Sequence, residues 1–237
     1  MKRWSLLEKI LLGAFLFWFT CGLIFTLGRV GPATIAAWPL PAWLHAFVAL
    51  CVRTGDPLLI LLAFANTHLL AARQWGAGAA RRWAVLVILL SLAVETLGAM
   101  TGFPFGAYAY TDRFGPVLGV VPLAIPLAWH VVLTNALFLV RGVAPHLPRW
   151  SEALGAGFVA TLYDALLEPF ATSVKGYWHW RDGSVPLQNY VAWLVVSTLL
   201  IRAFAPTMAG RANRDPRPAL ILGLTGVLFL AGIYSIS

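Results

Sequence analysis

Glu95 lies in the middle of an apolar run, Trp83 to Met100, and a dense motif of aromatic and glycine residues, Thr101 to Tyr110, follows directly. Placing a carboxylate at that depth in a bilayer costs about 2.5–3.5 kcal/mol on insertion scales. Its retention therefore indicates a role. Membrane proteins usually place such acids where protons, ions or the polar ends of substrates are handled.

Asp164 and Glu168 form a second acidic feature, because they are one helical turn apart in another apolar segment, Ser151 to Phe170. A carboxyl shielded from water holds its proton to higher pH and can act as a general acid, while a second carboxylate nearby stays ionised. The competing interpretation is structural: Glu95, Asp164 and Glu168 only bond helices together through polar partners.

Composition identifies a polytopic membrane protein, since 60% of the residues are hydrophobic and 11% are charged. We predict an all-α transmembrane helix bundle forming one integral-membrane domain over residues 1–237. About seven spans are expected, at roughly 6–27, 33–72, 83–101, 117–140, 151–170, 188–206 and 219–235. Arg53, Gly55, Asp56 and Pro57 interrupt the second stretch. Residues 33–56 therefore either span the membrane or lie at its interface.

The net charge of +8 is spread over short loops rather than gathered on a polar surface, so we expect no nucleic-acid partner. With the N-terminus inside, the inner segments contain Lys2, Arg3, Lys9, Arg73, Arg81, Arg82, Arg141, Arg149, Arg202, Arg211, Arg214 and Arg217. The outer segments contain Arg29, Arg53, Arg113, Lys175 and Arg181. This bias predicts a cytoplasmic N-terminus and a multi-pass protein of the cell's inner (plasma) membrane.

The two long outer loops, Gly102–Pro116 and Ala171–Leu187, are rich in aromatic residues. An interfacial aromatic belt is the plain explanation. However, both loops leave the helices that carry the buried acids. The same outer side is expected to hold Asp56 at the mouth of the second span, and Asn189 and Tyr190 at the start of the sixth. The polar groups therefore converge on one leaflet, where aromatic faces could stabilise a cation by about 0.5–2 kcal/mol each.

The sequence lacks the residue patterns that bind several classes of cofactor. The histidines, His45, His68, His130, His146 and His179, form no di-iron pattern. No P-loop or dinucleotide-binding glycine motif occurs, and no paired Asp-rich motif exists for magnesium and pyrophosphate. The lysines, Lys2, Lys9 and Lys175, avoid the last span, which excludes a retinal Schiff base there. We therefore predict no metal and no cofactor. Acid, base and aromatic walls suit protonation of an alkene and capture of the carbocation.

These same residues resemble a known family, the integral-membrane carotenoid biosynthesis proteins, over roughly residues 45–205. The motifs are Glu95-Thr-x-Gly98, Thr101-Gly-x-Pro-Phe-Gly106-x-Tyr108-x-Tyr110, Val121-Pro122, Trp129, Asp164 through Glu168-Pro169, Gly176-x-Trp178-x-Trp180 and Asn189-Tyr190-x-x-Trp193. The family includes carotenoid 1′,2′-hydratases of the γ-carotene and bisanhydrobacterioruberin type. The resemblance implies addition of water across the terminal C1′=C2′ bond of a ψ-end carotenoid, without a redox cofactor. Expected partners are the carotenoid, the lipid bilayer and other enzymes of the carotenoid pathway.

Roles are assigned by chemistry. Protonation at C2′ places the positive charge on C1′, the tertiary carbon. Glu95 or Asp164 is the expected proton donor, and Glu168 or the remaining acid would deprotonate the water. The predicted substrate-binding residues are Tyr108, Tyr110, Trp129, Trp178, Trp180, Asn189, Tyr190 and Asp56. The apolar walls of the third to sixth spans would hold the polyene.

Two alternatives remain open at this stage. A carotenoid end-group cyclase or isomerase would use the same protonation but leave the mass unchanged. A lipid or proton carrier, with no catalysis, would need polar groups along the whole depth of the membrane.

Overall fold

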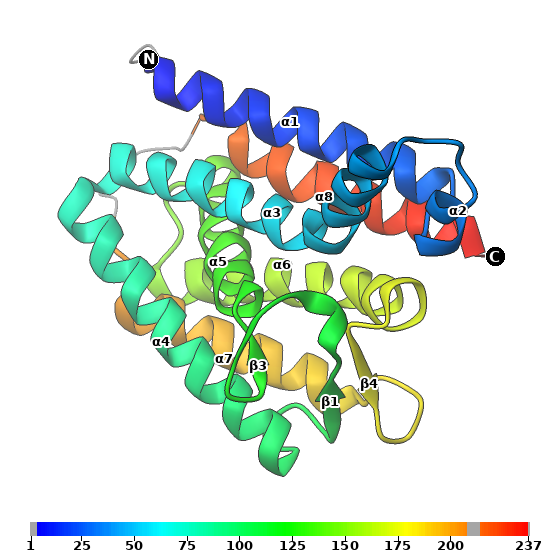
Figure 1. Ribbon diagram of the computed structural model, residues 1–237. Coiled ribbons are helices and arrows are strands. Elements are labelled where there is room, and N and C mark those ends of the chain that lie inside the picture. Colours follow the sequence, from blue (N-terminus) through cyan, green and yellow to red (C-terminus); the bar gives the residue numbers. More distant parts are fainter. Residues whose placement is uncertain (1–3, 208–213, 237) are drawn as a thin grey trace.

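The computed structural model describes residues 4–207 and 214–236, and helices dominate it (Figure 1). The helices are α1 (Leu6–Leu27), α2 (Pro32–Ala36), α3 (Ala42–Trp75), α4 (Ala77–Thr101), α5 (Ala124–Val143), α6 (Arg149–Pro169), α7 (Leu187–Phe204) and α8 (Arg217–Ile236). A 3₁₀ turn covers Asp112–Phe114, and a π-helical turn, Phe170–Lys175, continues α6. The predicted all-α bundle is confirmed.

Six helices among the described residues, all of the long ones except α6, are long and apolar enough to cross a membrane. The exception has 21 residues but carries Arg149, Glu152, Asp164 and Glu168. Charged side chains lower its hydropathy, while its length still suits a span. The number of about seven spans and the cytoplasmic N-terminus stay predictions.

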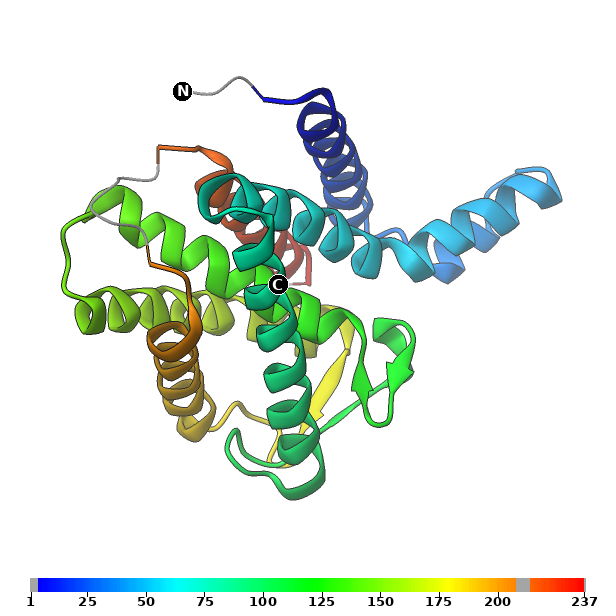
Figure 2. The same cartoon turned by 90° about the vertical axis from the view of Figure 1, so that its left-hand side faces the viewer.

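The ambiguous region before Asp56 divides into two parts. Residues Pro32–Ala36 form the short helix α2, whereas Ala42 begins a helix that runs through Pro57 to Trp75. At 34 residues, α3 is about 50 Å long, well above the roughly 30 Å of a bilayer core. Figure 2 shows its first half, in light blue, extending beyond the other long helices, with the short helix α2 beside it.

Short strands connect the helix ends. They are β1 (Tyr108–Tyr110), β2 (Val117–Leu118), β3 (Val121–Pro122) and β4 (Trp178–Trp180). The first and last pair with each other in antiparallel fashion, and β2 pairs with β3 in the same way. The sequence did not lead us to expect strands. We call the β1–β4 pair the aromatic ribbon.

At the end of the bundle opposite the aromatic ribbon, ion pairs between arginines and carboxylates link the helices. Glu8, at the start of α1, lies 3.2 Å from Arg73 of α3 and 3.0 Å from Arg217 of α8. Arg141 of α5 lies 2.7 Å from Glu152, at the start of α6. These arginines were predicted to lie on one side of the membrane, and the structure places them at one end. The predicted inner residues Lys2, Arg3 and Arg211 lie outside the described residues.

Gly157 allows α6 and α7 to pack closely. A Cβ there would collide with Thr198 Oγ1 and lie 3.2 Å from the backbone oxygen of Leu194. We expect Gly157→Ala to destabilise the protein by about 1–3 kcal/mol, because the helices must separate. The measurement is the thermal midpoint of the detergent-purified protein.

Gly155→Ala is the matched control, since a Cβ there meets only Val140 methyl groups at an ordinary 3.6 Å. Equal thermal midpoints for the two variants would show that this close approach does not matter.

Candidate active site

A cavity of about 120 Å³ lies where the ends of α4 and α6 meet the starts of α5 and α7. The three candidate acids, Glu95, Asp164 and Glu168, all line it. It is also lined by Tyr108, Tyr110, Trp129, Trp178, Trp180, Asn189 and Asp56. Thus the fold brings together every predicted site residue except Tyr190, which is half-buried on α7 and does not line the cavity.

The aromatic ribbon forms one wall of this cavity. Its register places Tyr108 opposite Trp180 and Tyr110 opposite Trp178. Side chains alternate between the two faces of a strand, so these four rings share one face. The residues between them, Ala109 and His179, are exposed on the other face. Pairing of the two aromatic loops therefore directs their rings toward the acids.

Glu95 is surrounded by hydrogen-bond donors. Its Oε2 accepts from the hydroxyls of Tyr108 at 2.6 Å and Tyr110 at 2.7 Å, and its Oε1 accepts from Trp129 Nε1 at 2.8 Å. Burial, together with the neighbouring carboxylate, raises the pKa of both tyrosines, so they keep their protons. Donors on both oxygens stabilise a negative charge and leave Glu95 fixed in place.

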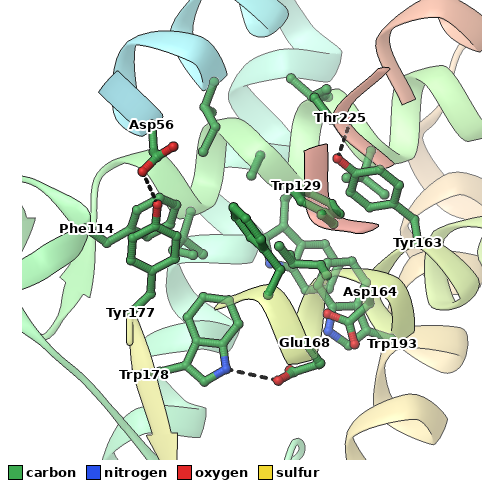
Figure 3. A pocket seen from close by; sticks show the side chains of 18 of the residues that line it. Asp56, Phe114, Trp129, Tyr163, Asp164, Glu168, Tyr177, Trp178, Trp193 and Thr225 are labelled. Carbon is green, nitrogen blue, oxygen red and sulfur yellow. Dashed lines mark hydrogen bonds between the residues drawn. The ribbon is translucent and has the colours of Figure 1, made fainter. Parts of the chain in front are cut away.

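Asp164 and Glu168 differ from Glu95, because each accepts hydrogen bonds through only one of its two carboxyl oxygens. Glu168 Oε2 accepts from Trp178 Nε1 at 3.1 Å and Trp180 Nε1 at 2.9 Å. Asp164 Oδ2 accepts from Asn189 Nδ2 at 2.7 Å. The other oxygens, Asp164 Oδ1 and Glu168 Oε1, receive no hydrogen bond from the described residues. Figure 3 shows both carboxyls beside the cavity, with Trp178 donating to Glu168.

Stacked indoles form another wall. The rings of Trp129 and Trp193 are 3.9 Å apart and within 6° of parallel. Trp193 was part of the sequence motif, but we did not predict it as a site residue. Its spacing from Asn189 contained the signal, because positions i and i+4 share a helix face. Phe105 and Tyr163 also line the cavity without having been predicted.

Asp56 reaches the cavity from α3, on a different side from the paired acids (Figure 3). It accepts hydrogen bonds from Lys175 Nζ at 2.9 Å and from the Tyr177 hydroxyl. Tyr177 in turn stacks on Phe114. Burial and the Asp56 charge raise the pKa of Tyr177, which therefore remains a donor. Asp56 is thus paired with Lys175 and Tyr177, and these bonds tie α3 to the segment before β4.

Within residues 4–207 and 214–236, no group of three or more His, Cys, Asp or Glu side chains is arranged to hold a metal ion. The cavity instead combines two carboxyls that each present one open oxygen, a third carboxyl group, Glu95, held by three donors, and aromatic walls. Such a set can transfer protons and stabilise a nearby cation.

A model of the carotenoid biosynthesis protein family matches residues 55–237. The chain belongs to this family. A bisanhydrobacterioruberin hydratase of Haloarcula japonica is 30% identical to it over 126 residues, which cover 51% of this chain and 43% of that protein. The similarity therefore spans less than half of the relative's length. No solved structure matches this family member.

Proposed function

We propose that the protein is a carotenoid hydratase of the cell's plasma membrane. It adds water across the terminal C1′=C2′ double bond of a ψ-end carotenoid. The observation that carries the proposal is the pairing of Asp164 and Glu168, each with one open oxygen, beside aromatic walls. Membership of the family and the similarity to the Haloarcula japonica hydratase support it.

The size of the cavity suits an end group rather than a whole polyene. An engineered apolar cavity of about 150 Å³ binds benzene. At about 120 Å³ the cavity accommodates a fragment close to that size, such as a terminal isoprene unit. The acids therefore meet only the end of the molecule, which is where the proposed reaction occurs.

In our proposal Asp164 donates the proton. Asn189 occupies one oxygen, so the proton resides on the open Oδ1 and is transferred to C2′. The π bond breaks, a C2′–H bond forms and the charge appears on tertiary C1′. The Trp129–Trp193 stack and the fixed Glu95 carboxylate stabilise this cation.

Glu168 completes the reaction. Its open Oε1 accepts a proton from water while the water oxygen bonds to C1′, giving a tertiary alcohol. The proton then passes from Glu168 to Asp164, one helical turn away, and the site is restored. Water is consumed and no other reactant is required, so the proposed hydratase works without a cofactor.

The decisive experiment expresses the protein alone in a host that accumulates a ψ-end carotenoid. We expect a new pigment with the added mass of one water. A cyclase or isomerase would give a product of unchanged mass, and a carrier would give no new pigment. An unchanged pigment profile from well-expressed protein in the membrane fraction would overturn the proposal.

Gly98 is needed for the contact between Tyr108 and Glu95. A Cβ at this position would lie 2.8 Å from Phe105 Cδ2 and 2.9 Å from the Tyr108 hydroxyl oxygen. We expect Gly98→Ala to displace Tyr108 and lower the hydration rate roughly tenfold, the effect of losing one hydrogen bond to a charged group. Initial rates in membrane vesicles test this.

Gly78→Ala is the control on the same helix, because its nearest neighbour is the flexible end of Arg82 at 3.7 Å. Equal rates for both alanine variants would contradict a role for the Tyr108–Glu95 bond.

A further inference from the structure

A second cavity of about 290 Å³ lies between α1, the first half of α3 and α8. It shares Asp56, Leu59 and Leu228 with the active-site cavity, so the two cavities adjoin at these residues. We call this second cavity the tail groove. Its lining is mainly apolar. Trp18 of α1 and Gly55 of α3 both line it, and Trp18 Nε1 donates to the Gly55 oxygen at 2.8 Å.

The walls of the tail groove come mainly from α1 and the first half of α3. One wall consists of the second half of α1, including Phe17, Gly22 and Phe25, and the other includes Phe47 of α3. Figure 2 shows the first half of α3 extending from the bundle, which opens the space between these helices. Most of these residues precede residue 55, where the match to the family begins.

We propose that the tail groove binds the polyene chain of the same molecule whose end group occupies the active-site cavity. This inference rests on the proposed function. The active-site cavity has room for an end group alone, so the remaining polyene requires an apolar passage that begins there. The tail groove adjoins that cavity at Asp56, Leu59 and Leu228.

The junction between the two cavities explains why the passage can contain a charged residue. Asp56 is paired with Lys175 at 2.9 Å and accepts from the Tyr177 hydroxyl, so it does not present an unpaired charge to the polyene. Leu59 and Leu228 supply the apolar side of the same junction. The polyene therefore runs between the first, second and last long helices, rather than between the third to sixth predicted spans.

The location of the walls has a consequence for specificity. The acids and the aromatic ribbon lie within the part of the chain that matches the family, whereas most tail-groove residues lie before it. We infer that α1 and the first half of α3 select the length and shape of the polyene, while the catalytic residues select its end group.

Glycine substitutions provide a steric test. An added Cβ at Gly22, in the tail groove, or at Gly13, on the same helix but outside it, meets nothing within 4 Å. Both Gly22→Phe and Gly13→Phe should therefore fold.

For a full-length ψ-end polyene we expect Gly22→Phe to lower kcat/KM at least tenfold, whereas Gly13→Phe stays within twofold of wild type. For a short analogue of about two isoprene units, both variants should match wild type. Equal behaviour of the two variants on the long substrate would overturn the inference.

The chain's cysteines provide a second test that does not depend on turnover. Cys21 and Cys51 are unpaired thiols, and both line the tail groove. In vesicles of one fixed lipid composition, we expect the acyclic polyene to slow their alkylation by N-ethylmaleimide at least fivefold. A Gly13→Cys thiol in a Cys21→Ser/Cys51→Ser background should be alkylated equally fast with and without polyene.

The outcomes separate the two proposals. Protection without any hydrated product would support the tail groove and count against the hydratase. Hydrated product without protection would support the hydratase and overturn the tail groove. Alkylation that is slow in lipid alone and unaffected by polyene would show that the groove holds lipid, which also overturns the inference.

Discussion

The variant Asp164→Asn is expected to lower the hydration rate by about a hundredfold to ten-thousandfold, the usual contribution of a general acid. Asparagine is nearly isosteric, and its carbonyl oxygen can still accept the 2.7 Å hydrogen bond from Asn189. The substitution therefore keeps the contact between α6 and α7 while removing the proton that we assign to Oδ1. Initial rates with purified protein in vesicles measure the effect.

This variant separates catalysis from a structural role for the acid. If Asp164 only bonds α6 to α7, asparagine serves equally well and activity is retained. The same change at exposed Asp182, which follows the aromatic ribbon, is the control and should leave the rate within twofold of wild type. A rate for Asp164→Asn close to that of Asp182→Asn would show that the proton comes from another group.

The sequence was most informative about the acids, because each carboxylate within an apolar run stands out against its surroundings. The cost of burial singled out Glu95, Asp164 and Glu168, and the predicted order of the spans placed them near the same side of the membrane. The aromatic loops were recognised by composition alone. Their pairing was missed because three-residue strands give too short a pattern, although Tyr-Ala-Tyr and Trp-His-Trp alternate with the period of a strand.

The start of α7 shows that residues adjacent in sequence need not line the same cavity. Asn189 and Tyr190 are adjacent in sequence, so a helix turns their side chains about 100° apart. Only Asn189 lines the cavity, and the second residue of α7 that does so is Trp193, four positions later. Helical spacing thus accounts for both the predicted residue that lies outside the cavity and the unpredicted one that lines it.

The tail groove could not be predicted because its shape depends on how far α3 diverges from α1. Residues 33–56 are apolar, and their sequence is compatible with either a span or an interfacial segment. The direction of the first half of α3 is set by tertiary contacts such as the Trp18–Gly55 hydrogen bond. Contacts between distant segments of this kind have no local sequence pattern.

The variant Glu168→Gln is expected to reduce hydration by at least about a hundredfold. One amide oxygen can still accept from both Trp178 Nε1 and Trp180 Nε1, so the aromatic ribbon keeps its position. The amide cannot remove a proton from water, and the reaction should stop after the cation has formed. An unchanged thermal midpoint would verify that the fold is intact.

Deuterium uptake by the recovered alkene shows whether the reaction stops after protonation, as expected for Glu168→Gln, or before it, as expected for Asp164→Asn. In D₂O, the Asp164 carboxyl of Glu168→Gln carries deuterium, transfers it to C2′, and recovers a proton from the cation when water fails to add. The recovered alkene should therefore gain deuterium, whereas alkene recovered from Asp164→Asn should gain none. Equal labelling in the two variants would overturn the division of roles between the two acids. Wild-type rates for Glu168→Gln would show that its carboxylate serves only to hold Trp178 and Trp180.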